Sequence, residues 1–447
     1  MRIPCYDTAR QDRRTLLKLS GLSLVGATAG CLESDEESTP TDSNGGGGGS
    51  DGGDGEDTTT ASDDGGSMSS YTIGMVDSLT GSLAPYGERN TRGRKLAVEA
   101  INEVGIGEDE TPLNIAVEDD ESTNQGGVNA AQKLVNQDGV PLLIGSVGSG
   151  VSIAIHDSVV KGSGVVQISQ NSTSPELTSR PELLRMSPSG AAKGKALANL
   201  VNDDGHDTVA VTWINNDYGT GLSDVFAETF ESELDGTVEY NQPHDQGQSS
   251  YSGILTEMAS TDASAWVFIT YANEFTVMAN EGFDQGYNTQ VDYYGAESTI
   301  ADSIIENTPA GSMDGMKGIT ESAPSDQDNY QNFVSEFESA YDASPTVWSA
   351  YAYDAVTVAA LAIEAAGEFS SDALAEVVRD VTRPDGEEVF NFAEAVEILR
   401  DGGSASDINY QGVSGPVDLD ENGDPPGFYQ VYSVADHSYE FGDYITS

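Results

Sequence analysis

Short apolar runs alternate with amphipathic stretches along the chain beyond residue 70. The runs predict strands, and the stretches predict helices with apolar residues on one face. The first strands are expected at 71–76, 113–117, 142–144 and 165–168, with helices at 86–104, 128–135 and 151–161. Strand–helix units repeated at this spacing are typical of a parallel sheet covered by helices on both faces.

The same pattern restarts after Pro188. It predicts strands at 208–213, 237–242, 265–270, 291–294 and 313–320, with helices at 190–201, 222–234, 249–258 and 273–281. Further helices are predicted at 326–341, 348–366, 372–378 and 391–399. Residues 71–447 are too many for one core, so we expect an α/β protein of two lobes with a ligand site at the carboxyl ends of its strands.

The stretch PLLIGSVGSGVS at 141–152 joins a buried strand to a helix through glycines and serines. Backbone N–H groups and hydroxyls at the start of a helix suit a small anion, such as a phosphate or a carboxylate. The glycine spacing is GxxGxG, and no lysine lies near it. A nucleotide-binding loop is therefore the less favoured interpretation.

The charge is extreme, with 75 acidic and 19 basic residues and a net charge of −56. Such a field disfavours nucleic acid or an anionic membrane face as a partner. In molar salt the screening length falls to about 3 Å, and the self-repulsion largely disappears. The composition therefore predicts a protein adapted to brine, and an ordinary acidic protein of high solubility is the alternative.

The residues before 71 are expected to lie outside the fold. Arg13 and Arg14, with the apolar run that follows, resemble a twin-arginine export signal at 1–30, and the run is too short for a membrane span. Cys31 lies where a lipobox cysteine would be lipidated, and a simple cleaved signal is the alternative. Residues 31–70, rich in Asp, Glu, Ser, Thr and Gly, predict a disordered tether.

The motifs of common enzymes and metal sites are missing, including GxSxG, HExxH and GxxxxGK[ST]. The cysteines are Cys5 and Cys31, and the four histidines show no ligand spacing, so we expect no metal, no cofactor and no enzymatic activity. The stretch DLDENG at 418–423 imitates a calcium loop. Tyr429 occupies the position of that loop's bidentate glutamate, which favours a turn between two strands.

Hydroxyl, aromatic and acidic residues follow several predicted strands. They are Tyr86, Ser149, Ser172, Thr173, Tyr218, Tyr271 and Glu297. Hydroxyls and helix N-termini suit a carboxylate, and one acid among aromatic faces suits an ammonium group. Together these residues fit an amino-acid zwitterion, although each one alone is more often a packing or surface residue.

In these stretches the chain resembles the substrate-binding proteins of branched-chain amino-acid ABC importers, the leucine/isoleucine/valine-binding family with the type I periplasmic-binding-protein fold. The resemblance covers residues 71–447. It is carried by LTGSLAPYG at 79–87, GRKLAVEAIN at 93–102, the glycine–serine stretch at 142–150, STSPELT at 172–178, DYG at 217–219, GAE at 295–297, YDA at 353–355, GVSGP at 412–416 and NGD at 422–424.

The resemblance implies that Ser149 and Thr173 hold the ligand carboxylate and that Glu297 holds its ammonium group. It also implies that Tyr86, Tyr218 and Tyr271 line the pocket. Two departures from the family pattern, GSG at 148–150 and QN at 170–171, indicate room for a larger or more polar ligand than leucine.

The same resemblance implies a Venus-flytrap fold, in which the chain crosses between lobes near 187–189, 319–321 and 427. The first lobe then comprises 71–188 and 319–427, and the second comprises 189–318 and 428–447. The implied function is a monomeric, lipid-anchored extracellular receptor that delivers an amino acid, or a related solute such as an amide, to a membrane permease. A ligand-sensing receptor on the same scaffold and, less favoured, a nucleotide-using enzyme are the alternatives.

Overall fold

The computed structural model describes residues 69–446. The predicted signal, Cys31 and the tether up to residue 68 lie outside the described residues. None of the helices between residues 69 and 446 combines the length and the apolar character needed to cross a bilayer.

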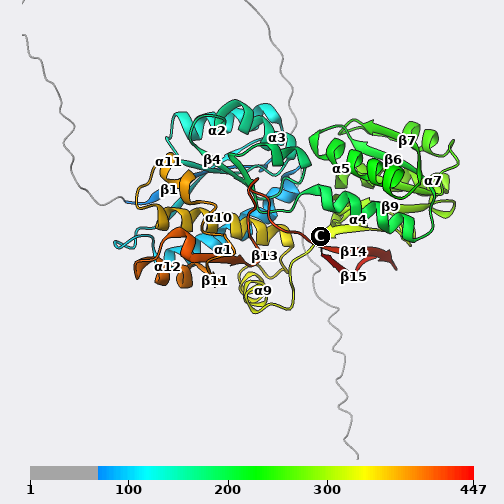
Figure 1. The fold of residues 1–447 in the computed structure, drawn as a ribbon. Helices are drawn as coiled ribbons and strands as arrows, with labels where there is room; N and C mark the ends of the chain where they lie inside the picture. Colours follow the sequence, from blue (N-terminus) through cyan, green and yellow to red (C-terminus); the bar gives the residue numbers. More distant parts are fainter. Residues whose placement is uncertain (1–68, 447) are drawn as a thin grey trace, which may run out of the picture. The chain divides into compact units, whose positions relative to one another are not determined.

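The first lobe is built on a five-stranded parallel sheet in the order β2-β1-β3-β4-β5 (Figure 1). Its strands are β1 (Tyr71–Asp77), β2 (Leu113–Asp119), β3 (Leu142–Ile144), β4 (Val166–Ser169) and β5 (Leu183–Arg185). The helices between them are α1 (Ala84–Val104), α2 (Asn124–Asn136) and α3 (Ser149–Ile155), which a π-helical turn, η1 (His156–Val160), extends. The apolar runs predict the first four strands but not β5, whose apolar run is only Leu183 and Leu184 before Arg185.

Alternate residues of β1 face two layers of helices. Ile73 and Met75 pack in one core cluster with residues of α1, whereas Val76 packs in another with residues of α2 and α3. Figure 1 shows α2 and α3 on one side of this sheet and α1 on the other. The side-chain period of two along a strand therefore places helices on both faces, as the sequence predicts.

The second lobe is built on a seven-stranded sheet in the order β15-β14-β10-β9-β8-β6-β7. Its strands are β6 (Thr208–Ile214), β7 (Thr237–His244), β8 (Ala265–Ile269), β9 (Asp292–Ala296), β10 (Lys317–Glu321), β14 (Phe428–Ala435) and β15 (Ser438–Thr446). Its helices are α4 (Gly190–Asp203), α5 (Asp217–Glu228), α6 (Ser252–Met258), α7 (Ala272–Gln285) and α8 (Asp302–Asn307). β14 pairs antiparallel with both β10 and β15, and the other strands pair in parallel. The sequence pattern does not predict β14 and β15, because polar and charged residues interrupt their apolar runs.

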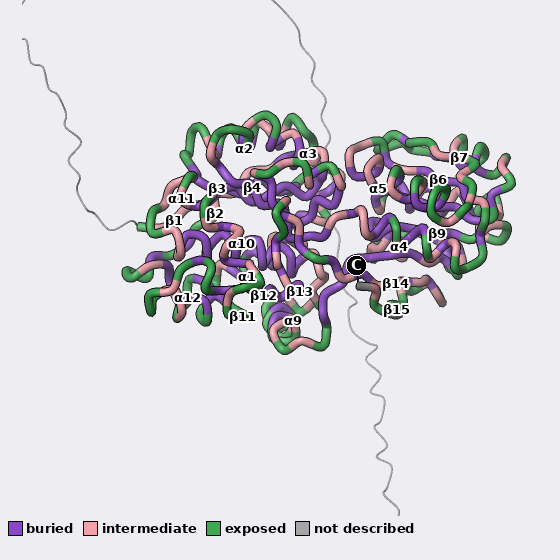
Figure 2. Tube along the Cα trace, in the orientation of Figure 1, coloured by how far each residue is buried: buried purple, intermediate pink, exposed green. Residues whose placement is uncertain are grey.

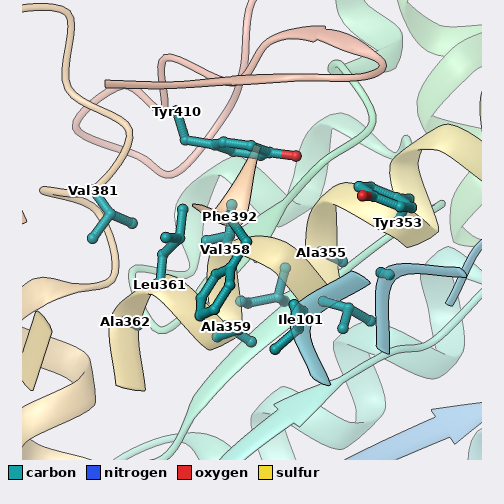
Figure 3. Packing of buried hydrophobic residues seen from close by; sticks show 14 of the residues in the cluster. Ile101, Tyr353, Ala355, Val358, Ala359, Leu361, Ala362, Val381, Phe392 and Tyr410 are labelled. Atoms are coloured by element: carbon teal, nitrogen blue, oxygen red, sulfur yellow. The ribbon is translucent and has the colours of Figure 1, made fainter. Parts of the chain in front are cut away.

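The C-terminal helices return to the first lobe and complete its core. They are α9 (Asp328–Tyr341), α10 (Val347–Ala366), α11 (Ser371–Val377) and α12 (Phe392–Arg400), with a small sheet of β11 (Glu387–Val389), β12 (Ile408–Gly412) and β13 (Gly415–Pro416). Figure 3 shows Ile101 of α1 among Val358 and Leu361 of α10, Phe392 of α12 and Tyr410 of β12, all members of one buried cluster. Figure 2 shows α10 within the buried part of the molecule, and 15 of its 20 residues are buried.

Two glycines on α1 allow the backbone of other segments to approach this helix closely. A Cβ atom on Gly93 would lie 2.0 Å from the carbonyl oxygen of Ser349 on α10. A Cβ atom on Gly87 would lie 2.1 Å from the carbonyl oxygen of Ser78, just after β1. No side chain fits at either position without moving the backbone, so the packing of α1 depends on both glycines.

The predicted crossings between lobes fall at three identifiable places in the chain. Residues 187–189 lie between β5 of the first sheet and α4, and Gly427 directly precedes β14. Residues 319–321, which the prediction assigns to the returning part of the first lobe, lie within β10 of the second sheet. The division of the chain into lobes at these residues remains a prediction.

Candidate functional site

Residues that follow strands of both sheets line one pocket. It contains all six residues predicted to contact a ligand, together with six others: Leu83, Tyr86, Val147, Gly148, Ser149, Asn171, Thr173, Tyr218, Tyr271, Glu297, Ser298 and Trp348. The empty space within the pocket and its mouth is about 470 Å³.

One side of the pocket carries hydroxyl groups at the start of a helix. Ser149 is the first residue of α3, and Ser149 and Thr173 are each 3% exposed. The Ser149 hydroxyl oxygen accepts the backbone N–H of Ser174 at 3.2 Å, which leaves its own hydrogen available to a ligand. These groups form a place where a small carboxylate can accept hydrogen bonds.

A buried network of serines holds this loop in position. The Ser152 hydroxyl accepts the backbone N–H of Ser146 at 2.7 Å and lies 2.8 Å from the hydroxyl of Ser172. The Ser169 hydroxyl donates to the carbonyl oxygen of Ser146 at 3.0 Å. The serines of the 141–152 stretch are therefore divided between two roles: Ser149 faces the pocket, and Ser146 and Ser152 fix the loop.

Three tyrosines form an aromatic wall. The rings of Tyr218 and Tyr271 are stacked, with centroids 5.6 Å apart and planes 14° apart, and the Tyr86 ring lies 6.3 Å from that of Tyr271. The Tyr218 hydroxyl lies 2.7 Å from that of Ser298, and the Tyr271 hydroxyl accepts a hydrogen bond from Asn216 at 3.0 Å. Burial raises the pKa of Tyr86 to about 12, so its phenol is neutral at physiological pH.

The acidic side of the pocket is Glu297, which directly follows β9. Its Oε2 atom lies 2.5 Å from the ammonium nitrogen of Lys193, on α4. The same nitrogen lies 2.8 Å from Oε1 of Glu321, the last residue of β10. Glu297 is thus already one member of a buried ion triad.

The triad lies in surroundings that contain little water. The side chains of Lys193 and Glu321 are each 0% exposed, and that of Glu297 is 8% exposed. Burial raises the pKa of Glu321 to about 7. Burial alone would lower the pKa of Lys193, but the two neighbouring carboxylates outweigh it and raise this pKa above its usual value. Lys193 therefore stays charged.

Sequence reasoning missed several residues of the site. Trp348 lies at the start of α10, distant in sequence from the other lining residues, and no motif marks it. Asn171 lines the pocket with its amide oxygen buried and without a hydrogen-bond partner, and the sequence marks it only through the QN departure from the family pattern at 170–171. Lys193 gave no signal, because a lysine in an amphipathic helix is usually solvated.

A metal site is not apparent in this part of the chain. Between residues 69 and 446, no group of three or more His, Cys, Asp or Glu residues is placed to hold a metal ion. In the loop at 418–423, the Asp420 carboxylate instead accepts the backbone N–H groups of Asn422 and Asp424. The loop lies between β13 and β14, and Arg185 forms an ion pair with Asp424 at 2.6 Å.

The sequence matches the family model described as periplasmic binding protein over residues 70–406. It is 30% identical over 224 residues to a Leu/Ile/Val-binding protein homolog of Brucella melitensis, and the match covers 49% of this chain and 60% of that protein. It is 26% identical to the leucine-, isoleucine-, valine-, threonine-, and alanine-binding protein of Pseudomonas aeruginosa, covering 70% of this chain and 83% of that one. It is 22% identical to the chemotactic signal transduction system substrate-binding protein BasB of Halobacterium salinarum, covering 84% and 90% of the two chains.

Solved structures share the arrangement of two α/β lobes. A leucine binding protein from Thermotoga maritima superposes with a TM-score of 0.72 at 23% identity, covering 84% of this chain and 98% of that one. A solute binding protein from R. palustris, solved in complex with benzoate, superposes with a TM-score of 0.69 at 18% identity, covering 85% and 98%. The predicted fold class, two α/β lobes of the periplasmic-binding-protein type, is confirmed.

Proposed function

We propose, from the premise that this chain belongs to the periplasmic binding protein family, that it is the extracellular receptor of an ABC importer and captures an amino acid. The match over residues 70–406 shows the family. The named relatives that bind leucine, isoleucine and valine support the substrate class. The match spans about 60% of the Brucella protein's length, so the substrate is argued from this chain's own pocket.

The observation that carries the proposal is the opposite chemistry of the pocket's two sides. Ser149 and Thr173 present hydroxyl and backbone donors on one side, and Glu297 presents a carboxylate on the other. An amino-acid zwitterion needs both, because its carboxylate accepts hydrogen bonds and its ammonium group donates them. Tyr86, Tyr218 and Tyr271 line the same pocket, where they would exclude water and contact the side chain of the ligand.

In this proposal a partner protein recognises the change of shape that ligand binding causes in the receptor. A ligand that contacts both lobes favours a closed form, by as much as its affinity differs between the open and closed forms. A membrane permease that docks only on the closed form therefore binds only receptors that carry a ligand. The receptor binds and releases its ligand without a chemical step.

The residues outside the described part complete the proposal. Export through a twin-arginine signal and lipidation at Cys31 would hold the receptor at the outer face of the cell membrane. The acidic tether would keep the receptor domain away from that surface. The net charge of −56 suits an environment of high salt, where screening suppresses repulsion within the domain. We expect the receptor to act as a monomer, and its charge disfavours nucleic acid as a partner.

Replacing Glu297 by Gln tests the proposal. The variant Glu297→Gln keeps the shape of the side chain but removes the charge that faces the ammonium group, so the affinity for the tightest-binding amino acid should fall about 10- to 100-fold. Glu306→Gln, at an exposed position on α8, is the control and should leave affinity unchanged. Calorimetric titration in high salt measures both variants. Unchanged affinity in Glu297→Gln would contradict the role of Glu297.

An aromatic carboxylate is the second candidate ligand. The stacked pair of Tyr218 and Tyr271 offers flat faces to an aromatic ring, and Lys193 already neutralises part of the Glu297 charge. The R. palustris neighbour was solved with benzoate. Benzoate that binds more tightly than any of the twenty standard amino acids would favour this candidate.

A sensory role on the same scaffold is the second candidate for the partner. The match with BasB of Halobacterium salinarum, which covers 84% of this chain, favours a sensory role. The name of BasB places that protein in a chemotactic signal transduction system. Both roles use the same ligand pocket. Pull-down with the ligand-loaded receptor distinguishes them, because a permease is recovered in one case and a signal transducer in the other.

A further inference from the structure

The ammonium group of Lys193 lies between two carboxylates, and one of them, Glu297, lines the ligand pocket. The side-chain nitrogen of Lys193, on α4, lies 2.5 Å from Oε2 of Glu297 and 2.8 Å from Oε1 of Glu321. The Tyr218 ring lies on another side, with its centroid 5.6 Å from the Lys193 nitrogen. Lys193 does not line the pocket, so it acts on a ligand only through Glu297 and the local field.

Three charged side chains form this cluster: Lys193, Glu297 and Glu321. The two carboxylates of Glu297 and Glu321 and the ammonium group of Lys193 leave one negative charge when all three are ionised, which for Glu321 requires a pH above about 7. Tyrosines surround the cluster, and burial keeps the phenols of Tyr218, Tyr351 and Tyr429 neutral by raising their pKa values. A charge held among neutral, buried groups is weakly screened, so any imbalance is felt by a ligand in the adjoining pocket.

Other charged groups near the pocket offset each other. Arg89 lies over the Tyr86 ring, 5.3 Å from its centroid, and offsets part of the rise that burial causes in the pKa of Tyr86. Glu274, which is buried on α7, acts on the same phenol in the opposite direction. The net negative charge that faces the acidic side of the pocket is therefore that of the triad.

We propose that Lys193 and Glu321 set the charge of the ligand that the pocket accepts, because together with Glu297 they leave a single negative charge that one ammonium group neutralises. The inference rests on the proposed function and names its substrate class. That class is a ligand with one ammonium group beside its carboxylate and no second positive charge. A second cation in the ligand would leave the buried cluster one charge too positive, and a carboxylate without an ammonium group would leave it negative.

A pair of variants separates this role from a structural one. Glu321→Gln removes one negative charge without touching the ligand pocket, and the cluster becomes neutral. Glu321→Gln combined with Lys193→Met, which keeps the length of the lysine stem, restores a single negative charge on Glu297. If charge is what matters, the second substitution repairs the damage of the first, which loss of packing would not allow.

Calorimetric titration is done at pH 8.5, where Glu321 is ionised, with two probes. They are the tightest-binding of the twenty standard amino acids and the same molecule without its amino group, which is 4-methylpentanoate in the case of L-leucine. Glu321→Gln should weaken the amino acid about 10- to 100-fold and should tighten the deaminated analogue about 3- to 10-fold. The double variant should bring the amino acid back to within about 3-fold of the wild-type affinity.

The outcomes distinguish the inference from the proposed function. Wild type that binds none of the twenty amino acids contradicts the proposed function itself. Wild type that binds, with Glu321→Gln weakening both probes alike or the double variant staying as weak as the single one, overturns only the inference. Should Glu321→Gln fail to fold, wild type alone carries the test, because lowering the pH from 8.5 to 5.5 protonates Glu321 and removes the same charge. The affinity for the amino acid, relative to that for the deaminated analogue, should fall about 10-fold over this range, and an unchanged ratio would overturn the inference.

Discussion

The hydroxyl of Tyr86, on α1 of the first lobe, donates a hydrogen bond to the backbone carbonyl of Ser298, after β9 of the second lobe, at 3.3 Å. The same oxygen accepts the backbone N–H of Ala272 at 3.4 Å. One residue of the pocket thus links the two lobes directly. A ligand that orders the Tyr86 ring strengthens the same link.

The variant Tyr86→Phe tests this link. It keeps the aromatic ring and removes both hydrogen bonds, so the affinity for the tightest-binding amino acid should fall about 3- to 10-fold. The ligand-free protein should also become more open, which small-angle X-ray scattering measures as a larger radius of gyration. Tyr71→Phe, outside the pocket, is the control. Equal affinity and equal radius in Tyr86→Phe and wild type would show that the hydroxyl does not couple the lobes.

The close approach of α1 and α10 predicts an effect on stability. Gly93→Ala places a methyl group 2.0 Å from the Ser349 carbonyl oxygen, so the helices must separate, and the free energy of unfolding should fall by about 1–3 kcal/mol. Gly253→Ala is the matched control, because it is also helical and a Cβ atom there has no neighbour within 4 Å. That control should gain about 0.5–1 kcal/mol from helix propensity. Denaturant unfolding measures both variants, and equal stabilities would refute the tight crossing.

The buried carboxylate of Asp354 predicts a dependence of stability on pH. It lies on α10 and accepts hydrogen bonds from the Tyr410 hydroxyl at 2.7 Å and from the backbone N–H groups of Val413 at 3.0 Å and Ser414 at 2.8 Å. Burial nevertheless raises its pKa from 3.8 to about 6. Between these two values the folded state binds more protons than the unfolded state, so the stability contributed by this group falls as the pH rises from about 4 to about 6.

The variant Asp354→Asn removes that titration and isolates it from the other acids. The free energy of unfolding of wild type, measured relative to the variant, should fall by about 2 kcal/mol as the pH rises from 4 to 6. Denaturant unfolding at several pH values gives this difference. A difference that is constant with pH, or that grows as the pH rises, would show that the carboxyl titrates normally in the folded protein.

Hydrophobic periodicity predicts the first sheet and the parallel part of the second, because most of their strands are apolar and alternate with long amphipathic helices. It fails for β5 and for β11 to β13, which have two to five residues each, and for β14 and β15, whose outer positions are polar. So few residues are recognised only when all of them are apolar, as in β3, and an interrupted pattern hides the period of a longer strand.

The residues at strand ends could be predicted because parallel strands end at the same edge of a sheet. Ser149 and Glu297 follow strands of different sheets, and they line the same pocket. The ion triad of Glu297, Lys193 and Glu321 could not be predicted. Lys193 and Glu321 are 128 positions apart in sequence, and they meet only because α4 packs against β10. The contact roles of the six predicted residues remain a proposal.

A crystal structure of the protein grown with its tightest-binding amino acid tests the zwitterion site most directly. We expect the ligand nitrogen within about 3.2 Å of a Glu297 oxygen and the ligand carboxylate at the same range from Ser149 and Thr173. A ligand with its amino group turned away from Glu297, or one bound outside the pocket of Tyr86, would contradict the proposed recognition.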